Sequence, residues 1–123
     1  MLFRSENLRR GAEVAKLFNE AGILCIAAFL APDEGVRQKA ADCVWRDRFL
    51  VVHLSAPIEV CRQRDTEGHY AKADKGEMPM FPGVSAPYDV PAKPDLILPT
   101  HQLSVADCVE RLVELLESKG ILA

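Results

Sequence analysis

The sequence predicts an α/β fold for residues 1–123, and three observations support this class. Apolar residues recur at helical spacing in several segments. Short continuous apolar runs alternate with those segments, which is typical of strands buried on both faces of a parallel sheet. The regular pattern stops between residues 65 and 93, where four of the eight prolines and three of the seven glycines lie. A length of 123 residues suits one domain, so we expect a single domain with one long loop.

The first third of the chain is expected to form a helix, a strand and the start of a second helix. Residues 5–21 carry apolar side chains along one helical stripe, and Gly22 is a typical stop just after a helix. Residues 23–29 form a continuous apolar run, which predicts a buried strand. The next helix opens at Pro32-Asp33-Glu34, because acidic residues are favourable near the positive end of a helix.

The remaining elements alternate in the same way. Residues 49–54 read as a strand, and a helix with proline at its first position is expected over residues 57–64. Residues 95–98 read as the last strand. Ser104 and Asp107 have the spacing of a capping box, which predicts that the final helix begins there.

The long loop, residues 65–93, exceeds the usual connection of about 4–6 residues. Long loops in compact domains are commonly lids over a binding site. We therefore expect this segment, called the lid below, to cover a site.

Composition excludes two classes of partner. The formal charge is −3 and the pI is about 5.6, whereas nucleic acids and anionic membrane surfaces favour a dense basic face. No apolar run approaches the roughly 20 residues that span a bilayer. We expect a cytoplasmic protein that binds neither nucleic acid nor membrane.

The four cysteines, Cys25, Cys43, Cys61 and Cys108, are widely spaced and lie in apolar stretches. Free cysteine in such surroundings is usually a small buried side chain, so we expect buried thiols rather than disulfides or a zinc site. The three histidines show no metal-ligand or catalytic-triad spacing. No metal-binding residue is predicted.

Arg4 and Asn7 stand three residues apart on the first expected helix, so their side chains project from neighbouring positions. An arginine fork suits phosphate or sulfate oxygens, and an asparagine amide can both donate to and accept from an adenine edge. From these residues alone, simple solvation of two polar side chains is the more ordinary interpretation.

Five short sequence motifs resemble those of a known family in their order and spacing. They are Arg4-Ser5-Glu6-Asn7-Leu8-Arg9-Arg10, Cys61-Arg62-Gln63-Arg64-Asp65, Lys72-Ala73 with Gly76-Glu77, Phe81 with Gly83, and Pro87-Tyr88. Together they resemble adenylylsulfate kinase, which transfers the γ-phosphoryl of ATP to the 3′-hydroxyl of adenosine 5′-phosphosulfate (APS) and so makes PAPS. The resemblance implies a P-loop kinase-like parallel sheet with flanking helices, with ATP as phosphoryl donor and Mg²⁺ as cofactor.

The resemblance implies contacts with APS at several matching positions. Phe81 would stack on the APS adenine, and the Leu30-Ala31 step would contact APS where the family has Ile-Ser. Lys72 would steer the phosphate or sulfate, although a solvated loop lysine is an open alternative. The full implied set for APS is Arg4, Asn7, Leu30, Ala31, Lys72 and Phe81.

Two further roles come from the same resemblance. Arg64 stands where the lid begins and is the catalytic candidate, because positive charge over a transferred phosphoryl group stabilises the transition state. Its alternative is an arginine at a helix end that pairs with Asp65. Cys108 closes the segment 103–108 that matches the surroundings of the ATP adenine, and it is the nucleotide-binding candidate.

The chain departs from the family pattern at three positions. Ala31 replaces a serine, Glu67 replaces a lysine, and Pro82 replaces a threonine together with its backbone N–H. A carboxylate near an anionic substrate should weaken its binding, so these changes predict reduced activity.

The phosphate-binding loop of this superfamily, Gly-x-x-x-x-Gly-Lys-Ser/Thr, does not occur in the 123 residues. We therefore expect a sheet that is incomplete at the N-terminus, in a truncated kinase that is inactive and poorly folded by itself. One alternative is a degenerate, non-catalytic module that binds a nucleotide or regulates a kinase through the family's dimer interface. Another is an α/β domain with no ligand.

The resemblance also implies macromolecular partners. These are a second copy in a homodimer and a fused or associated sulfate adenylyltransferase.

Overall fold

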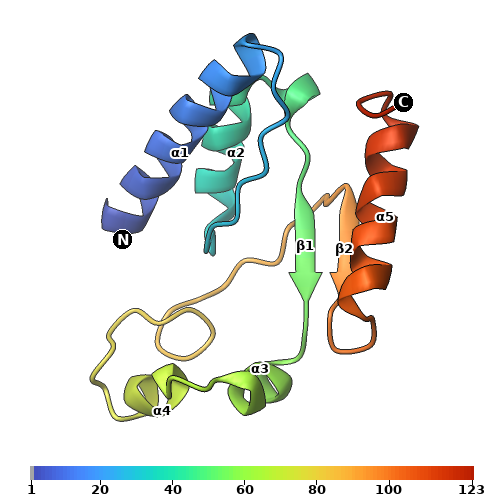
Figure 1. The fold of residues 1–123 in the computed structure, drawn as a ribbon. Coiled ribbons are helices and arrows are strands. Elements are labelled where there is room, and N and C mark those ends of the chain that lie inside the picture. The colour runs from blue at the N-terminus through green and yellow to red at the C-terminus, as the bar shows by residue number, and fades with distance from the viewer. Residues whose placement is uncertain (1) are drawn as a thin grey trace.

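The computed structural model describes residues 2–123. Figure 1 shows helices flanking a small sheet, with two short helices and a long irregular segment below it. In chain order the elements are α1 (Leu2–Glu20), α2 (Glu34–Val44), the 3₁₀ turn η1 (Arg46–Arg48), β1 (Val52–Ser55), α3 (Ile58–Arg64), α4 (His69–Asp74), β2 (Leu96–Pro99) and α5 (Val105–Ser118). The expected α/β class is confirmed, although no strand lies between α1 and α2.

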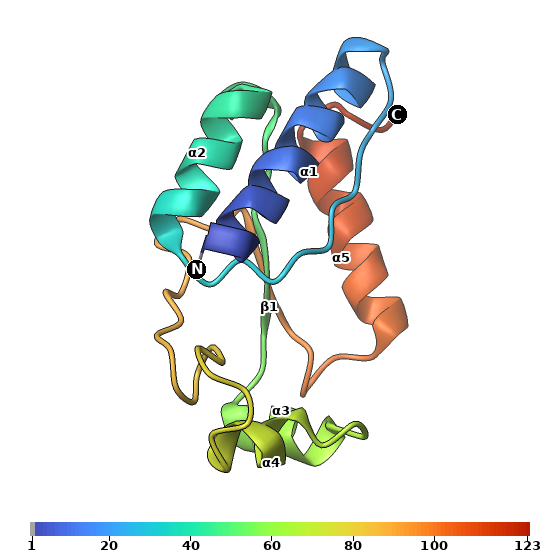
Figure 2. The ribbon, with the colours of Figure 1, turned by 90° about the vertical axis from the view of Figure 1, so that its left-hand side faces the viewer.

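The sheet consists of β1 and β2, which pair in parallel. Val52 lies opposite Leu96, and Ser55 lies opposite Pro99. The helices α1 and α2 pack on each other at the β1 side of the sheet, whereas α5 packs beside β2 (Figures 1 and 2). After β1 the chain forms α3, continues into the lid and then returns to β2.

The strand expected at residues 23–29 is not formed. The segment is extended and runs down past α1 and α2, but within residues 2–123 no strand pairs with it. Ile26 is 76% exposed, although an apolar run of this kind normally lies inside a sheet. A strand exists through its hydrogen-bonded ladder, so apolar composition alone does not make one.

One residue of this extended segment is held by α1. A Cβ built on Gly11 would lie 2.7 Å from the ring of Phe29, which is far closer than side chains tolerate. Glycine at this position therefore lets the Phe29 ring approach the helix, and this contact places the neighbouring Leu30 and Ala31.

Helix starts follow the expected local chemistry, with one correction. Asp33 caps α2 by accepting from the Val36 N–H at 2.9 Å. The sequence predicted Pro57 as the first helical residue of α3. In the structure Pro57 is the N-cap, and the helix begins at Ile58. The capping box at α5 is confirmed, since the Ser104 hydroxyl and the Asp107 carboxylate each accept from the other residue's backbone N–H.

The lid, residues 65–93, is less irregular than expected. It contains α4, followed by a turn in which the Phe81 carbonyl accepts from the amides of Ser85 and Ala86 at 2.9 Å. Gly83 lies in this turn with φ of +81°, a left-handed conformation that glycine adopts without strain.

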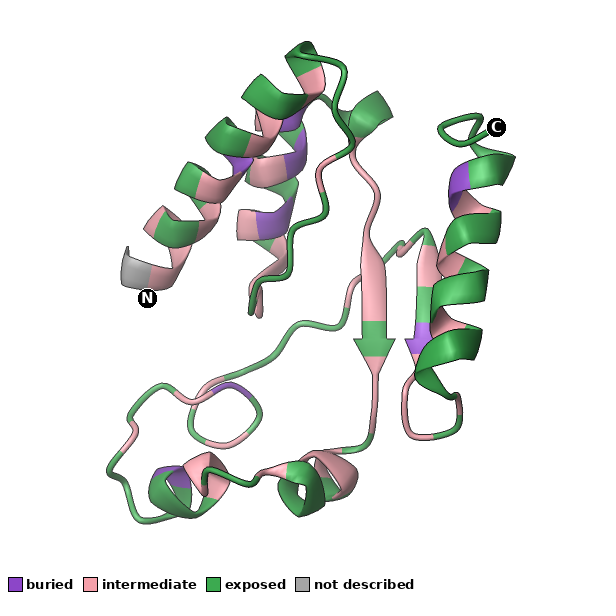
Figure 3. Ribbon diagram, viewed as in Figure 1, coloured by how far each residue is buried: buried purple, intermediate pink, exposed green. Residues whose placement is uncertain are grey.

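The core is small, as the sparse buried colour of Figure 3 shows. Its buried apolar residues are Ala12, Ala41, Val44, Ala73, Leu98 and Leu116. All four cysteines are free but only half-buried, so the expectation of buried thiols was wrong. Among the helices of residues 2–123, none combines the length and apolarity that a membrane crossing requires.

Candidate functional site

The structure brings Arg4 of α1 onto the lid. The Arg4 guanidinium donates through Nη1 to the Met80 carbonyl at 2.8 Å, across 76 residues of sequence. Met80 has φ of 60°, which is uncommon for a residue other than glycine. Since Phe81 follows directly, the cation and the aromatic ring expected to contact APS come from two segments that this hydrogen bond joins.

The Phe81 ring is supported from within the lid. It packs edge to face against Tyr70 of α4, with ring centroids 5.1 Å apart. The Arg62 guanidinium lies 5.1 Å from the Tyr70 ring and forms two hydrogen bonds to the Asp74 carboxylate, at 2.7 and 3.1 Å. These bonds hold the pKa of Asp74 below its usual range. The ring of Phe81 is therefore held by neighbours that the sequence did not single out.

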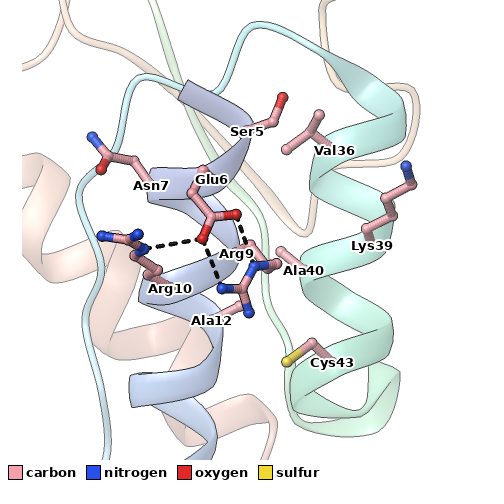
Figure 4. Close-up of a pocket in the computed structure, with 10 residues that line it drawn as sticks. All are labelled: Ser5, Glu6, Asn7, Arg9, Arg10, Ala12, Val36, Lys39, Ala40 and Cys43. Atoms are coloured by element: carbon pink, nitrogen blue, oxygen red, sulfur yellow. Dashed lines mark hydrogen bonds and ion pairs between the residues drawn. The ribbon is translucent and has the colours of Figure 1, made fainter. Parts of the chain in front are cut away.

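A groove of about 670 Å³ lies between α1 and α2 (Figure 4). Asn7 is one of its lining residues and is exposed, and its side chain points away from α2 in Figure 4. Glu6 accepts hydrogen bonds from Arg9 at 2.7 and 2.9 Å and from Arg10 at 3.0 Å. These bonds, first from Arg9 and then from Arg10, lower the pKa of Glu6 from 4.5 to about 2. Two of the arginines near Asn7 are thus already engaged by a carboxylate.

The Leu30-Ala31 step lies where the extended segment meets α2. Leu30 is 55% exposed, so its side chain is accessible to a ligand. The Ala31 carbonyl accepts a hydrogen bond from the Arg37 guanidinium. Although Ala31 lacks the hydroxyl of the family's serine, its backbone carbonyl is still held in place by Arg37.

Arg37 is the buried charged residue that the sequence did not predict. Its side chain is 8% exposed, and it donates to Glu34 Oε2 at 2.5 and 3.1 Å and to the Asp89 carbonyl at 2.6 Å. The hydrogen bonds from Arg37 are the main reason that the pKa of Glu34 is lowered. The spacing of the sequence could have predicted this burial. Arg37, Ala41 and Val44 have i, i+4, i+7 spacing and form the buried face of α2.

A second groove, of about 520 Å³, lies between the carboxyl ends of the strands and α5. Arg64 and Cys108 both line it, so the predicted catalytic and nucleotide-binding candidates are brought together. Arg64 donates to the Thr100 carbonyl at 3.0 Å. Asp65 instead accepts from the Tyr70 N–H at 2.9 Å, and this bond is the main cause that lowers its pKa. The alternative pairing of Arg64 with Asp65 is not what the structure forms.

Lys72 is exposed on α4 and lines neither groove. The two grooves share no lining residue, and neither Arg4 nor Phe81 is among the residues that line them.

Residues 2–123 contain neither a cluster of metal-ligating side chains nor the usual phosphate-binding loop. Over residues 2–123, no three side chains of His, Cys, Asp or Glu converge as metal ligands would. The sequence contains no glycine-rich loop between a strand and a helix, so no row of backbone N–H groups is available to cradle phosphates.

Parallel strands flanked by helices, with a lid after the helix that follows β1, make this an α/β protein. Similar solved structures assign it to the P-loop kinase class. The structure of the Mycobacterium tuberculosis APS kinase CysC in complex with AMPPNP and APS superposes with a TM-score of 0.87 at 36% identity, over 95% of this chain and 68% of that one. Residues 3–99 match the family model of adenylylsulphate kinase. The chain belongs to the adenylylsulfate kinase family.

Curated relatives agree with this assignment. The bifunctional enzyme CysN/CysC of Rhodopirellula baltica is 51% identical over 119 residues, which are 97% of this chain and 18% of that protein. The adenylyl-sulfate kinase of Bacteroides thetaiotaomicron is 49% identical over 116 residues, which are 94% of this chain. The chain thus spans 58% of the length of that kinase.

Proposed function

We propose that this chain carries the APS-binding and lid-bearing part of an adenylylsulfate kinase, the enzyme that phosphorylates the 3′-hydroxyl of APS with ATP to give PAPS. The observation that carries the proposal is the joining of Arg4 to the lid beside Phe81. This arrangement offers a guanidinium for the sulfate or phosphate and an aromatic face for the adenine.

Three further features support an APS site here. Asn7 lies one helical turn from Arg4 on α1, where its amide suits an adenine edge. Leu30 is exposed beside the backbone that Arg37 holds. The related CysC structure is a complex with AMPPNP and APS. Lys72 is proposed to steer the anion from α4.

The test is calorimetric titration of APS into the chain and its variants. Arg4→Ala removes a charged hydrogen-bond donor, worth about 1.5–3 kcal/mol, so APS should bind roughly 10- to 150-fold more weakly. Arg111→Ala is the matched control, since Arg111 is exposed on α5 and lines neither groove, and it should leave the affinity for APS unchanged. Equal affinities for the unaltered chain and Arg4→Ala would overturn the assignment of Arg4.

For the second groove we propose a nucleotide, with Cys108 on the wall and Arg64 acting on the transferred phosphoryl group. Its wall is mostly apolar, with Thr100 and Ser104 as polar members, as a purine site requires. Cys108→Trp should fill the groove and weaken ATP binding at least tenfold, while APS binding stays unchanged. Unchanged ATP affinity of a folded variant would remove Cys108 from the site. ATP and Mg²⁺ remain the implied co-substrate and cofactor of the kinase.

A second candidate function is a non-catalytic module that binds APS or a nucleotide without turnover. The departures from the family pattern at Ala31, Glu67 and Pro82 favour it. Binding of APS together with no PAPS formation, when ATP and Mg²⁺ are supplied, would support this alternative for the chain by itself.

Association with other polypeptides completes the proposal. The bifunctional relative favours a fused or associated partner enzyme, for which sulfate adenylyltransferase is our prediction. A homodimer and a cytoplasmic location also remain predictions.

A further inference from the structure

The buried guanidinium of Arg37 connects the C-terminal part of the lid to α2 through hydrogen bonds. Arg37 donates to the carbonyls of Ala31 and Asp89 and to the Glu34 carboxylate. These acceptors belong to the extended segment, the lid and α2 respectively, so one side chain joins three separate parts of the fold. Figure 1 shows the returning lid passing the lower end of α2, where these groups lie.

Two backbone contacts close the same junction. The Asp89 N–H donates to the Pro32 carbonyl at 2.8 Å, and the Glu34 N–H donates to Asp89 Oδ2 at 3.1 Å. The lid thus pairs with the turn that carries Leu30 and Ala31, and the Asp89 carboxylate caps one of the free amides in the first turn of α2.

Arg37 is buried more deeply than structural ion pairs on helix surfaces usually are. The Arg37 side chain is 8% exposed. By contrast, Arg46 lies just beyond the end of α2, pairs with Asp42 and is 60% exposed. A buried guanidinium must have its donors satisfied, since an unpaired buried charge is costly. Arg37 therefore keeps the Ala31 carbonyl and the lid backbone in fixed positions.

We propose that Arg37 is a positioning residue for APS, which it does not itself need to touch. By holding the Ala31 carbonyl and the lid backbone at Asp89, it sets the distance between the Leu30-Ala31 step and the lid that carries Phe81. This inference rests on the proposed APS site. Displacing a ligand-facing segment by about 1 Å can reduce binding or rate strongly, which is why a remote anchor matters.

The test compares variants by APS affinity, by the urea midpoint and by exchange of the Glu34 and Asp89 amide protons. Arg37→Met keeps much of the side-chain volume but removes every donor. We expect faster exchange of both amides and roughly tenfold weaker APS binding. Arg46→Met is the matched control and should change neither quantity, because its ion pair is exposed.

A second pair of variants decides the question if Arg37→Met does not fold. Asp89→Ala leaves no buried charge unpaired but removes the acceptor for the Glu34 N–H. Asp89→Asn keeps a side-chain oxygen that can accept from it. We expect Asp89→Ala to weaken APS binding several-fold and to lower the urea midpoint by no more than the loss of one capping bond, and Asp89→Asn to restore APS binding.

The outcomes separate this inference from the function on which it rests. APS affinity that is unchanged in Asp89→Ala and in folded Arg37→Met, while the two amides exchange faster, would make Arg37 a purely structural anchor and overturn the inference alone. Failure of the unaltered chain to bind APS would overturn the proposed function and this inference together.

Discussion

At the scale of single residues, several arginines already form ion pairs within the protein in the absence of a ligand. Glu6 engages both Arg9 and Arg10, Asp74 engages Arg62, and Glu34 engages Arg37. The Arg4 guanidinium, in contrast, donates to a backbone carbonyl, which a substrate anion can replace. This difference explains why Arg4, rather than its neighbours on α1, is the arginine that we assign to APS.

The Glu6 cluster predicts a pH dependence of stability. The pKa of Glu6 lies near 2 in the folded chain, below its ordinary value of 4.5. Its contribution is therefore complete above pH 4.5 and is lost as the pH falls from 4.5 towards 2. We expect the urea midpoint of Glu6→Gln to fall less over this interval than that of the unaltered chain.

The effect should be small, because these side chains are exposed and solvent screens them. Raising the ionic strength should reduce the difference between the two chains further. Parallel pH profiles for both chains at low salt would contradict the prediction.

At the scale of elements, helix starts depend on side chains a few residues away. Asp33 begins α2, and Ser104 with Asp107 begins α5. Hydrogen bonds from the Ser104 hydroxyl and backbone lower the pKa of Asp107, which shows how closely the carboxylate is held. The cap matters for the second groove, since Ser104 and Cys108 both line it.

Removing this cap should destabilise the chain measurably. Ser104→Ala loses the acceptor for the Asp107 N–H and should lower the free energy of unfolding by about 1 kcal/mol. Ser104→Thr keeps the hydroxyl and should lose much less. Urea denaturation followed by circular dichroism compares the three chains, and equal losses for both variants would show that the hydroxyl is not the stabilising group.

At the scale of the whole molecule, the chain exposes more surface than its size requires. Its accessible area is 8493 Å², whereas a compact monomer of 13.6 kDa exposes about 6,600 Å². Much of the excess is apolar, as the exposure of Phe18, Ile26 and Leu54 at 45%, 76% and 64% shows. A small two-stranded sheet with so few buried residues gives limited cooperativity.

This exposure predicts association of the isolated chain. We expect strong fluorescence of the apolar dye ANS, and a light-scattering mass that rises above 13.6 kDa with concentration. Ile26→Lys should lower both signals, while the same change at the polar, exposed Gln63 should not. Weak dye binding together with a constant mass of 13.6 kDa would contradict this prediction and the homodimer.

The helices α1, α2, α3 and α5 could be predicted from the sequence, because periodic stripes and capping bonds involve residues within a few positions of one another, whereas α4 within the lid was not predicted. The family could be predicted for a related reason, since its phrases are short and ordered. Residues 23–29 show the limit of this approach. An apolar run predicts a strand, but only a neighbouring backbone can complete the ladder, and none of the described residues supplies one.

The sequence by itself determined the α/β class, the family resemblance and the residue types of the candidate APS site. Tertiary structure alone decided that Arg4 meets the Met80 carbonyl across 76 residues, that Arg64 meets Thr100 across 36, and that Arg37 meets Asp89 across 52. In each case the acceptor is a backbone carbonyl, which every residue possesses, so side-chain identity carries no information about the partner. Only the path of the folded chain determines which carbonyl comes within reach.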